Sequence, residues 1–508
     1  MGNSAHNTDG INGLPPAFLK RMGALLCDDA AVCALERALT REDRTHALRL
    51  MPGRDIQLQD LPWISPEDAV PWEQAAVLYP ESETLRPGRK AYHEAGAYYI
   101  QEPSAMLPVA LLDPKPGERI LDLCAAPGGK STQIAAHLGD TGLLVCNEVD
   151  PVRARTLTAN LERMGVMQVL VFSMPPAVLA EYFEGYFDRI LVDAPCSGEG
   201  LMRRNPEAVR QWDETLVDRC AQRQQEILDA AFRMLAPGGR LVYATCTFER
   251  EEDEAQIEAL LVGYPGVFRP VPVTTVGASG TDPRRQPDGW QIMPGISADE
   301  SVRCCCVRLW PHLVQGEGQF AAVLDRMDPL TDARAADSAG SVRRPFPVRT
   351  DTRLVRQGST EQNVWEAFCR EHLAETKSVE LQAGNCIRFE DHLLMLPKEI
   401  PGLPVGLKLL CAGRRVGSVR RSGRGEIRFE PDHALAHMLC AGDMQEGRFV
   451  CLDPEGQEVG RYLAGESLRM GDARPGWVLV CAGRTGLGWA KSDGRTLKNH
   501  YPKGLRIT

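Results

Sequence analysis

Two cysteines follow directly after two expected strands, and their thiols are the groups in this sequence best suited to covalent chemistry. Cys196 lies in DAPCSGEG, residues 193–200, and Cys246 lies in ATCTFEREEDE, residues 244–254. The carboxyl ends of the strands in an open α/β sheet border the ligand crevice, so we expect both thiols to face one crevice. A single cysteine of this kind is usually a small buried residue, but two in matching positions favour a reactive site.

A thiolate can activate a pyrimidine for methylation. Its addition to C6 of cytosine makes an enamine whose C5 attacks a sulfonium methyl group; loss of the C5 proton and elimination of the thiolate then give 5-methylcytosine. Free cysteine has a pKa of about 8.5, so this chemistry needs a positive charge or a helix start nearby. Asp193 is placed to hydrogen-bond the N3 edge of the base.

Such chemistry needs a methyl donor, and residues 118–150 predict a nucleoside site. They read as strand, Pro-Gly-Gly turn at 127–129, helix and second strand. Glu148 and Asp150 lie where this topology places a carboxylate on a ribose. Neither the dinucleotide fingerprint nor a Walker loop is present, so a nucleoside without a pyrophosphate, such as S-adenosylmethionine, fits better. An ordinary Gly-Pro turn remains the alternative.

The composition is that of a globular protein of about three domains. The chain has 508 residues, 43% of them hydrophobic and 25% charged. No apolar run approaches the ~20 residues of a membrane helix, and the N-terminus lacks a signal pattern, so we expect a cytoplasmic protein. The 16 cysteines are scattered without paired spacing, which is typical of reduced thiols. His433, His437 and Cys440 could converge on a metal, but a helix packing its apolar side is favoured and no metal is expected.

Charge is distributed unevenly along the chain. The formal net charge is −10, yet residues 385–508 carry 19 Lys and Arg against 14 Asp and Glu, a net charge of +5. The preceding 384 residues therefore carry −15. A basic region joined to an acidic body indicates an anionic partner, although a solvated charged surface would look the same.

The order of elements predicts four regions. Residues 1–95 predict a small N-terminal α/β module, 96–324 a catalytic domain, 325–362 a polar linker and 363–508 a β-rich C-terminal region. Strands and helices alternate within the second region, which predicts a doubly wound, mostly parallel sheet.

Several finer expectations follow within these regions. We expect a long helix at 207–235 and a strand at 301–309 that buries Cys304, Cys305 and Cys306. After Cys196, the sequence suits a phosphate-contacting loop with a stacking ring, or a helix start with exposed arginines. The residues concerned are Arg203, Arg204, Arg210 and Trp212.

Three segments together resemble the Sun/RsmB/RsmF family of RNA 5-methylcytosine methyltransferases. They are LDLCAAPGGKSTQ (121–133), ILVDAPCSGEG (190–200) with the following RRNPEAVRQW, and LVYATCTFEREEDE (241–254). The tail, with RFEPDHALAH and GWAKSDGRTLKNHYPKGLR, is similar to the RsmF branch. The resemblance implies a Rossmann-like S-adenosylmethionine-dependent methyltransferase domain with a small N-terminal α/β module and a β-rich, PUA-like, RNA-binding C-terminal domain.

The resemblance also implies an activity and its residues. The activity is cytosine-C5 methylation of RNA, with 16S ribosomal RNA or the small subunit as the expected partner. Cys246 would be the nucleophile, Cys196 would assist product release, and Asp193 would be the acid at a strand end. The cofactor would contact Cys124, Ala125, Ala126, Pro127, Gly128, Gly129, Lys130, Glu148 and Asp193.

The chain departs from the family's sequence pattern at two places, and two alternative functions remain. Ser173 and Met174 stand where the family usually has an acidic or amide residue near the adenine, and residues 45–54 lack the family's L-R-x-N-like spelling. Transfer RNA is the alternative substrate. A non-catalytic ribosome-assembly factor that binds RNA through its basic tail is the alternative from another class.

Overall fold

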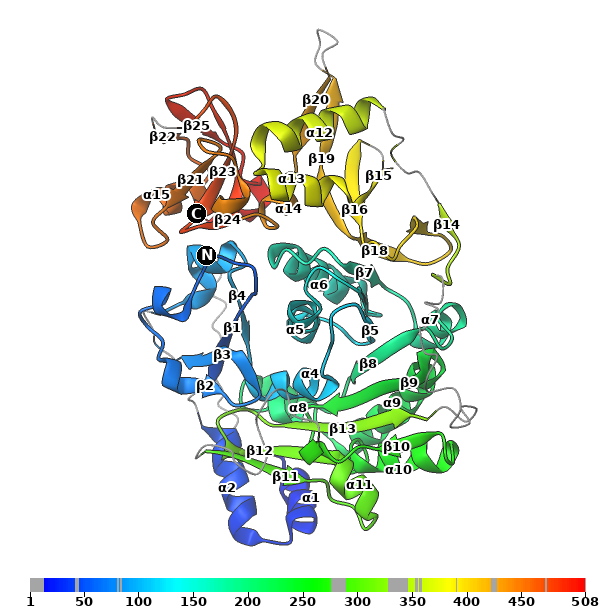
Figure 1. Cartoon of the computed structure of the whole chain (residues 1–508). Coiled ribbons are helices and arrows are strands. Elements are labelled where there is room, and N and C mark those ends of the chain that lie inside the picture. Colours follow the sequence, from blue (N-terminus) through cyan, green and yellow to red (C-terminus); the bar gives the residue numbers. More distant parts are fainter. Residues whose placement is uncertain are drawn as a thin grey trace, which may run out of the picture.

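A ten-stranded mixed sheet, with parallel strands in its middle and antiparallel strands at both edges, forms the centre of the protein in the computed structural model (Figure 1). The structure describes residues 13–41, 45–79, 82, 85–275, 289–327, 346–351, 355, 359–389, 391–421, 427–470 and 473–507. The sheet has the order β11-β12-β13-β9-β8-β5-β6-β7-β18, and β10 pairs with β13.

The bounds of its strands follow the apolar runs of the sequence. They are β5 (Arg119–Asp122), β6 (Leu143–Asn147), β7 (Val169–Phe172), β8 (Phe187–Asp193), β9 (Leu235–Thr245), β10 (Phe268–Pro270), β11 (Trp290–Pro294), β12 (Cys306–Val314), β13 (Gln319–Arg326) and β18 (Leu409–Ala412). The pairs that join β7, β6, β5, β8 and β9 are parallel, and β9 and β13 are antiparallel. This is the predicted doubly wound sheet.

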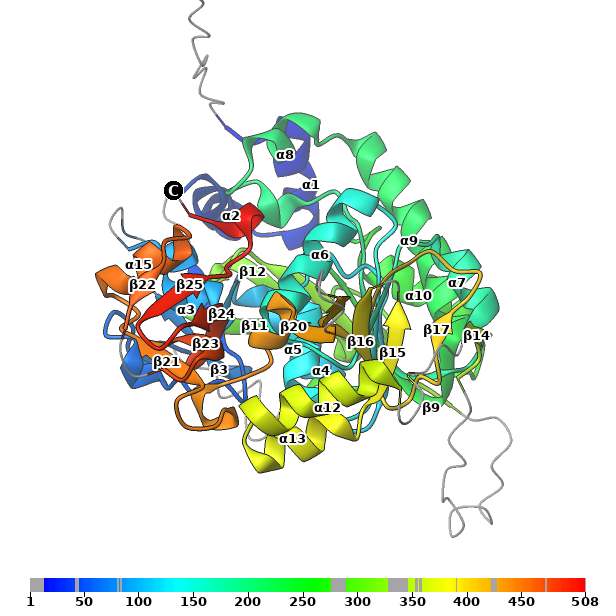
Figure 2. The same ribbon diagram turned by 90° about the horizontal axis from the view of Figure 1, so that it is seen from above.

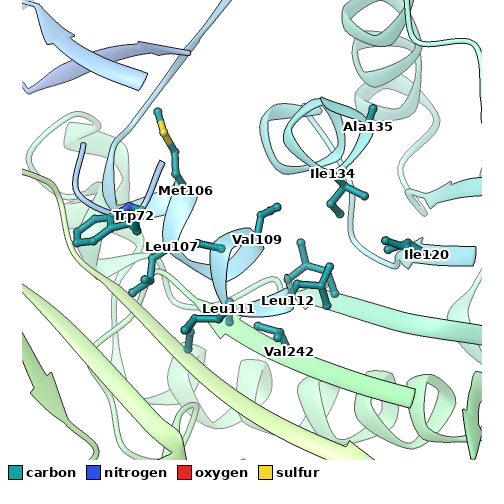
Figure 3. Packing of buried hydrophobic residues seen from close by; sticks show 14 of the residues in the cluster. Trp72, Met106, Leu107, Val109, Leu111, Leu112, Ile120, Ile134, Ala135 and Val242 are labelled. Carbon is teal, nitrogen blue, oxygen red and sulfur yellow. The ribbon is translucent and has the colours of Figure 1, made fainter. Parts of the chain in front are cut away.

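Helices cover both faces of this sheet because successive strand residues point to opposite sides. Ile120 and Leu144 belong to one hydrophobic core, and their neighbours Leu121 and Val145 belong to the other. Figure 3 shows the first core, where α4 packs between the sheet and Trp72 of the N-terminal module. The helices of this domain are α4 (Leu107–Leu112), α5 (Gly129–Leu138), α6 (Pro151–Arg163), α7 (Pro176–Tyr182), α8 (Pro206–Gln211), α9 (Glu214–Met234), α10 (Glu254–Gly263) and α11 (Glu300–Cys305).

The N-terminal region has two parts. An antiparallel sheet in the order β2-β3-β1-β4 contains β1 (His46–Leu50), β2 (Ala69–Val70), β3 (Glu73–Tyr79) and β4 (Tyr98–Gln101), and α3 (Ala91–Glu94) precedes its last strand. The helical pair α1 (Pro16–Leu26) and α2 (Asp29–Thr40) lies apart from this sheet, beneath β11 and β12 in Figure 1.

The C-terminal region contains two small sheets. The first, β15-β16-β19-β20, comprises β15 (Asn385–Phe389), β16 (His392–Leu396), β19 (Arg414–Arg421) and β20 (Ile427–Pro431), with α12 (Thr360–His372) and α13 (Glu375–Gln382). The second, β21-β23-β24-β25-β22, comprises β21 (Phe449–Leu452), β22 (Leu468–Arg469), β23 (Gly476–Ala482), β24 (Thr485–Ser492) and β25 (Thr496–Asn499), with α14 (His433–Ala436) before it and α15 (Gln457–Leu463) within it. The short strands β14 (Thr350–Asp351) and β17 (Leu403–Pro404) pair with each other.

The C-terminal region contacts the rest of the chain in several places. Strand β18 adds antiparallel to β7 at the edge of the central sheet. Figure 2 shows the second small sheet beside α3, where Lys90 pairs with Glu455 at 2.6 Å.

Two expectations about local structure were wrong. The expected helix at 207–235 is two helices, because Asp213 accepts the backbone N–H of Leu216 at 2.7 Å and caps a new start. The expected strand at 301–309 begins only at Cys306, since α11 precedes it. Most of the expected linker at 325–362 lies outside the described residues; of its described part, the Phe346 ring packs against that of Phe183, with ring centres 5.9 Å apart. No helix among the described residues is both long and apolar enough to cross a membrane.

Candidate active site

The two cysteines meet because β8 and β9 are neighbouring parallel strands. Asp193 pairs in register with Ala244, so the loops that follow the two strands leave the sheet side by side. The sulfur atoms of Cys196 and Cys246 lie 3.2 Å apart. Both residues line a cavity of about 950 Å³ at the carboxyl ends of the strands. The pKa of Cys196 is raised well above its ordinary value by the hydrogen bond with Cys246 and by burial, so Cys196 is a thiol at neutral pH.

The turn after β5 lines the same cavity. Cys124, Ala126, Pro127 and Lys130 reach the cavity wall. Ala125, Gly128 and Gly129 lie behind it: the Ala125 N–H donates to the Asn147 carbonyl at 2.9 Å, and Gly128 has a φ of +112°.

Side chains hold the carbonyl groups of this turn. Arg153 donates to the Ala126 carbonyl at 2.9 Å, and Asn160 donates to the Pro127 carbonyl at 2.9 Å. Arg49, from β1 of the N-terminal sheet, donates to the Gly129 carbonyl at 3.3 Å. The turn is therefore fixed from two domains.

Carboxylates stand at the ends of β6 and β8. Glu148 is buried, lines the cavity and accepts the backbone N–H of Asp150 at 3.0 Å. Asp150 itself caps α6 by accepting two backbone N–H groups. Lys130 lies 2.8 Å from Asp193. Burial lowers the pKa of Lys130, but the charge and hydrogen bond of Asp193 outweigh burial, so the pKa is raised and Lys130 stays a cation.

The segment after β7 shows how the departure at 173–174 is accommodated. Pro175, Pro176 and Ala177 line the cavity. The Ser173 N–H donates to the Lys408 carbonyl at 3.0 Å, and the Lys408 N–H donates to the Met174 sulfur at 3.3 Å. Ser173 and Met174 thus bind the strand β18 region of the C-terminal half.

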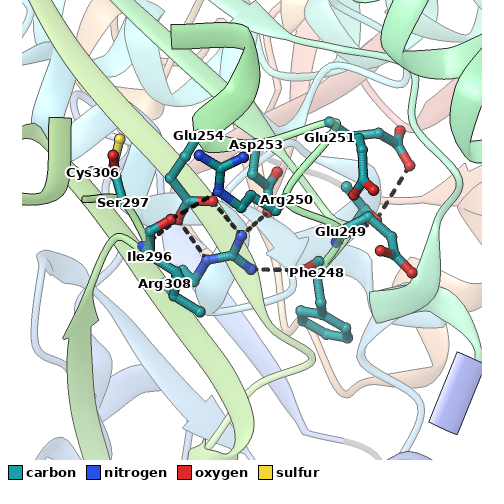
Figure 4. A network of polar contacts seen from close by, with 12 residues as sticks. Phe248, Glu249, Arg250, Glu251, Asp253, Glu254, Ile296, Ser297, Cys306 and Arg308 are labelled. Carbon is teal, nitrogen blue, oxygen red and sulfur yellow. Dashed lines mark hydrogen bonds and ion pairs between the residues drawn. The ribbon is translucent and has the colours of Figure 1, made fainter. Parts of the chain in front are cut away.

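A buried ion-pair cluster fixes the loop that follows Cys246 (Figure 4). Arg308 of β12 donates to Glu254 at 2.8 and 2.6 Å, and its Nη2 lies 3.1 Å from Asp253. The same guanidinium donates to the Phe248 carbonyl at 2.9 Å. Because all three charged side chains are fully buried and paired, the backbone from 248 to 254 has one well-defined position.

Sequence reasoning missed a second buried cluster beside the thiols. The hydroxyl oxygens of Ser197 and Thr247, each one residue after a site cysteine, lie 2.8 Å apart. Glu199 and Glu252 accept hydrogen bonds around this pair. The position next to each cysteine was the signal available in the sequence, but polar side chains there look like exposed loop residues.

Of the two alternatives for the segment after Cys196, the stacking of Trp212 on a base was wrong. Trp212 is buried against Phe18 of α1, with ring centres 5.6 Å apart, and its Nε1 donates to Glu199 at 2.7 Å. Arg203 and Arg204 both pair with Glu317, and Arg204 lines the cavity. Arg210 is exposed beside Glu207.

The three residues weighed as metal ligands do not converge. His433 and His437 contact each other, Nε2 to Nε2, at 3.1 Å, while Cys440 donates to the Gly53 carbonyl at 3.4 Å. Within the described part of the chain, no group of three or more His, Cys, Asp or Glu could hold a metal ion.

Four family models match separate stretches of the chain. The model of the 16S rRNA methyltransferase RsmB/F matches residues 109–325. The N-terminal domain of 16S rRNA methyltransferase RsmF matches 14–103, the RsmF first C-terminal domain 367–439, and the methyltransferase RsmF PUA domain 449–507.

Curated relatives and a solved structure agree with these matches. Ribosomal RNA small subunit methyltransferase F of Psychromonas ingrahamii is 30% identical over 97% of this chain and 97% of its own, and that of Salmonella typhi is 30% identical over 97% and 96%. NSun6 from Pyrococcus horikoshii, solved with SFG, shares the fold, with a TM-score of 0.52 at 18% identity over 63% of this chain and all of that chain. The chain belongs to the 16S rRNA methyltransferase RsmB/F family.

Proposed function

We propose that this protein methylates C5 of a cytosine in 16S ribosomal RNA through a covalent adduct on Cys246. The family is one of S-adenosylmethionine-dependent cytosine-C5 methyltransferases. The observation that carries the proposal is the pair of thiols, 3.2 Å apart, in the cavity that the turn after β5 also lines. A protein that only binds RNA has no use for two thiols in such a place.

The cavity residues fit the cofactor by the chemistry of their donor set. S-adenosylmethionine supplies an electrophilic methyl group on a sulfonium. Glu148 is placed to accept hydrogen bonds from the ribose, and Cys124, Ala126, Pro127 and Lys130 form the adjoining wall. Ala125, Gly128 and Gly129 act through the shape of the turn rather than by lining the cavity.

The two cysteines would divide the chemistry. The Cys246 sulfur bonds to C6 of the cytosine, which sends the electrons of the C5–C6 double bond to C5 for attack on the methyl group. In release, the C5 proton passes to water, the electrons of the C5–H bond restore the C5–C6 double bond, and Cys246 leaves as a thiolate; Cys196, beside it, is the group expected to assist. The raised pKa of Cys196 keeps it a thiol, which can donate a hydrogen bond to the Cys246 sulfur 3.2 Å away. Asp193, held by Lys130, would bind the N3 edge.

The C-terminal region supports an RNA partner. Arg415, Arg420, Lys498 and Lys503 are exposed there. Arg414 is not part of this set, because it is buried and donates to the Gly413 carbonyl at 3.0 Å. The relatives are named ribosomal RNA small subunit methyltransferases, which favours 16S RNA, and a cytoplasmic location goes with that substrate.

Two variants test the chemistry. Cys246→Ala should abolish methyl transfer, and Cys196→Ala should trap a covalent enzyme–RNA adduct that migrates slowly in a denaturing gel. Cys386→Ala, at a partly buried cysteine outside the cavity, is the matched control and should behave like the native protein. Activity of Cys246→Ala would refute the assigned nucleophile.

Bisulfite sequencing of RNA from cells with and without the gene tests the substrate. A cytosine in 16S RNA that loses protection without the gene supports the proposal. A mark lost only in transfer RNA would move the substrate, and no lost mark would favour the assembly factor.

A further inference from the structure

The two site cysteines are joined through the residues that follow them. Ser197 and Thr247 are buried, and their hydroxyl oxygens lie 2.8 Å apart. Ser197 also contacts Oε1 of Glu252 at hydrogen-bond distance, and Thr247 donates to Oε2 of Glu199 at 2.7 Å. The shortest contacts form one chain, Glu252–Ser197–Thr247–Glu199, whose members alternate between the β9 loop and the β8 loop. Ser197 also lies 3.2 Å from Oε1 of Glu199.

The three shortest oxygen–oxygen contacts form this chain, but its two hydroxyl groups supply only two protons. If both glutamates were ionised, each hydroxyl would donate to its own carboxylate, and the two hydroxyl oxygens would face each other at 2.8 Å without a proton between them. A third proton, on one carboxyl group, makes every link a hydrogen bond. One of the two glutamates is therefore neutral.

The hydrogen-bond donors around each glutamate decide which of the two is neutral. Glu199 accepts the Trp212 Nε1–H at 2.7 Å on one oxygen and the Phe248 N–H at 2.7 Å on the other, where Thr247 also donates. Both of its oxygens thus face donors, as an ionised carboxylate requires.

The two oxygens of Glu252 differ. Oε2 accepts the Ser197 N–H at 3.0 Å and the Gln224 amide at 2.8 Å. Oε1 faces only hydroxyl oxygens, those of Ser197 and, at 3.4 Å, Thr247. Oε1 of Glu252 is therefore the atom that can carry the proton and donate it to Ser197.

We propose that protonated Glu252, Ser197, Thr247 and ionised Glu199 form a positioning device that holds Cys196 and Cys246 in contact. All four are positioning residues, since they act through the cysteines beside them. This inference deepens the proposed function and rests on it for its use in catalysis, but the geometry of the thiols can be tested without methyl transfer.

Burial and neighbouring charges act on both glutamates of the device. Burial raises the pKa of Glu252 to about 7, and burial raises the pKa of Glu199 to about 7 as well. The nearby acidic groups are Glu249, which pairs with Arg21 at 2.7 Å, and Asp253 and Glu254, which pair with Arg308. The remaining titratable neighbours are the thiols Cys196 and Cys220 and the phenol of Tyr243, which donates to the Glu252 carbonyl at 2.6 Å.

An asymmetric pair of amide variants tests the assignment on the full-length protein. The Glu252→Gln side chain can place its amide NH₂ at the position of the protonated Oε1 and its carbonyl at the position of Oε2. The hydrogen bond to Ser197 therefore survives. Glu199→Gln must turn its amide NH₂ toward the N–H of Trp212 or of Phe248. In either orientation one buried hydrogen bond to this side chain is lost. The readout is the rate at which diamide, which accepts the two thiol hydrogens, forms the Cys196–Cys246 disulfide, measured by mass spectrometry of the digested protein.

Glu252→Gln should form this disulfide at nearly the native rate, and Glu199→Gln about tenfold more slowly, as expected for one lost buried hydrogen bond. Above pH 7 the native protein should form the disulfide more slowly than Glu252→Gln, because Glu252 loses its proton whereas the glutamine amide keeps its hydrogens. The reverse order of the two variants, or equal rates in both and in the native protein, would overturn the inference.

Threonine variants give the same test if Glu199→Gln fails to fold. Thr247→Val removes the hydroxyl and should slow the disulfide, whereas Thr247→Ser should restore it. Thr245→Val is the matched control, because Thr245 also flanks Cys246 and donates to a buried carboxylate, Asp253, at 2.6 Å, but has no link to Ser197. An equal effect of Thr245→Val and Thr247→Val would contradict the device. Failure of the proposed function, by contrast, would appear as an active Cys246→Ala and would leave these disulfide rates unchanged.

Discussion

The ammonium nitrogen of Lys130 lies 2.8 Å from Oδ2 of Asp193, and this ion pair joins the turn after β5 to the end of β8. Both side chains line the cavity, and both are largely buried, with 11% and 29% of their side-chain surface exposed. The pair therefore sets the charge of the cavity wall beside the thiols.

Lys130→Met should weaken S-adenosylmethionine binding at least about tenfold, because it leaves the Asp193 carboxylate without its cation in a partly buried site. Calorimetry measures the affinity. Lys115→Met is the control, since Lys115 pairs with Asp113 at 2.6 Å on the exposed surface, where such a pair contributes at most about 1 kcal/mol. Equal affinities of the two variants would contradict this role of Lys130.

Lys408→Pro should lower cofactor affinity several-fold through the backbone alone. Proline has no N–H to donate to the Met174 sulfur, so the segment whose residues Pro175 and Pro176 line the cavity loses an anchor. Lys408→Ala keeps the N–H and should bind like the native protein. A loss of affinity in both variants would mean that the side chain, not the backbone, matters.

Exposed and buried arginines of the tail should differ in their effects. Joint replacement of Arg415 and Arg420 by Ala should weaken RNA binding and flatten its dependence on salt, because phosphate contacts release counterions. Arg414→Ala should instead lower the free energy of unfolding, since Arg414 is buried within the sheet. Filter binding over a salt series and urea unfolding measure the two effects; a salt slope unchanged by the double variant would refute the first.

Glu252 should make stability depend on pH. Its pKa is raised from 4.5 to about 7, so the folded protein binds more protons than the unfolded chain in this range, and the free energy of unfolding falls as pH rises through it. The change attributable to this group is up to about 3 kcal/mol.

Urea unfolding at pH 5 and pH 8 checks this prediction. Glu252→Gln should lose less stability over the interval than the native protein, and Glu446→Gln, at an exposed glutamate, should lose as much as the native protein. Parallel pH curves for the native protein and Glu252→Gln would show that Glu252 does not hold a proton in the folded state.

The sequence by itself determined the central sheet and the meeting of the thiols. Residues 120–124 and 143–146 are apolar runs that a two-sided sheet requires, and the glycine turn between them permits a positive φ at Gly128. Cys196 stands three residues after the end of β8, and Cys246 stands one residue after the end of β9. Because neighbouring parallel strands end at the same edge of a sheet, these positions bring both cysteines to that edge. The local sequence pattern was therefore enough to predict that the thiols meet.

Only the tertiary structure decided which polar and aromatic residues are buried. Trp212 packs on Phe18 although its sequence context suited an exposed stacking ring, and Arg414 is buried, because burial depends on which distant segment packs opposite. The same reason hid β18, whose partner β7 lies more than 200 residues earlier. Hydrogen bonds between Ser197, Thr247 and the two glutamates also depend on the packing of two loops, and no periodicity along the chain reports a contact that exists only after both loops have folded.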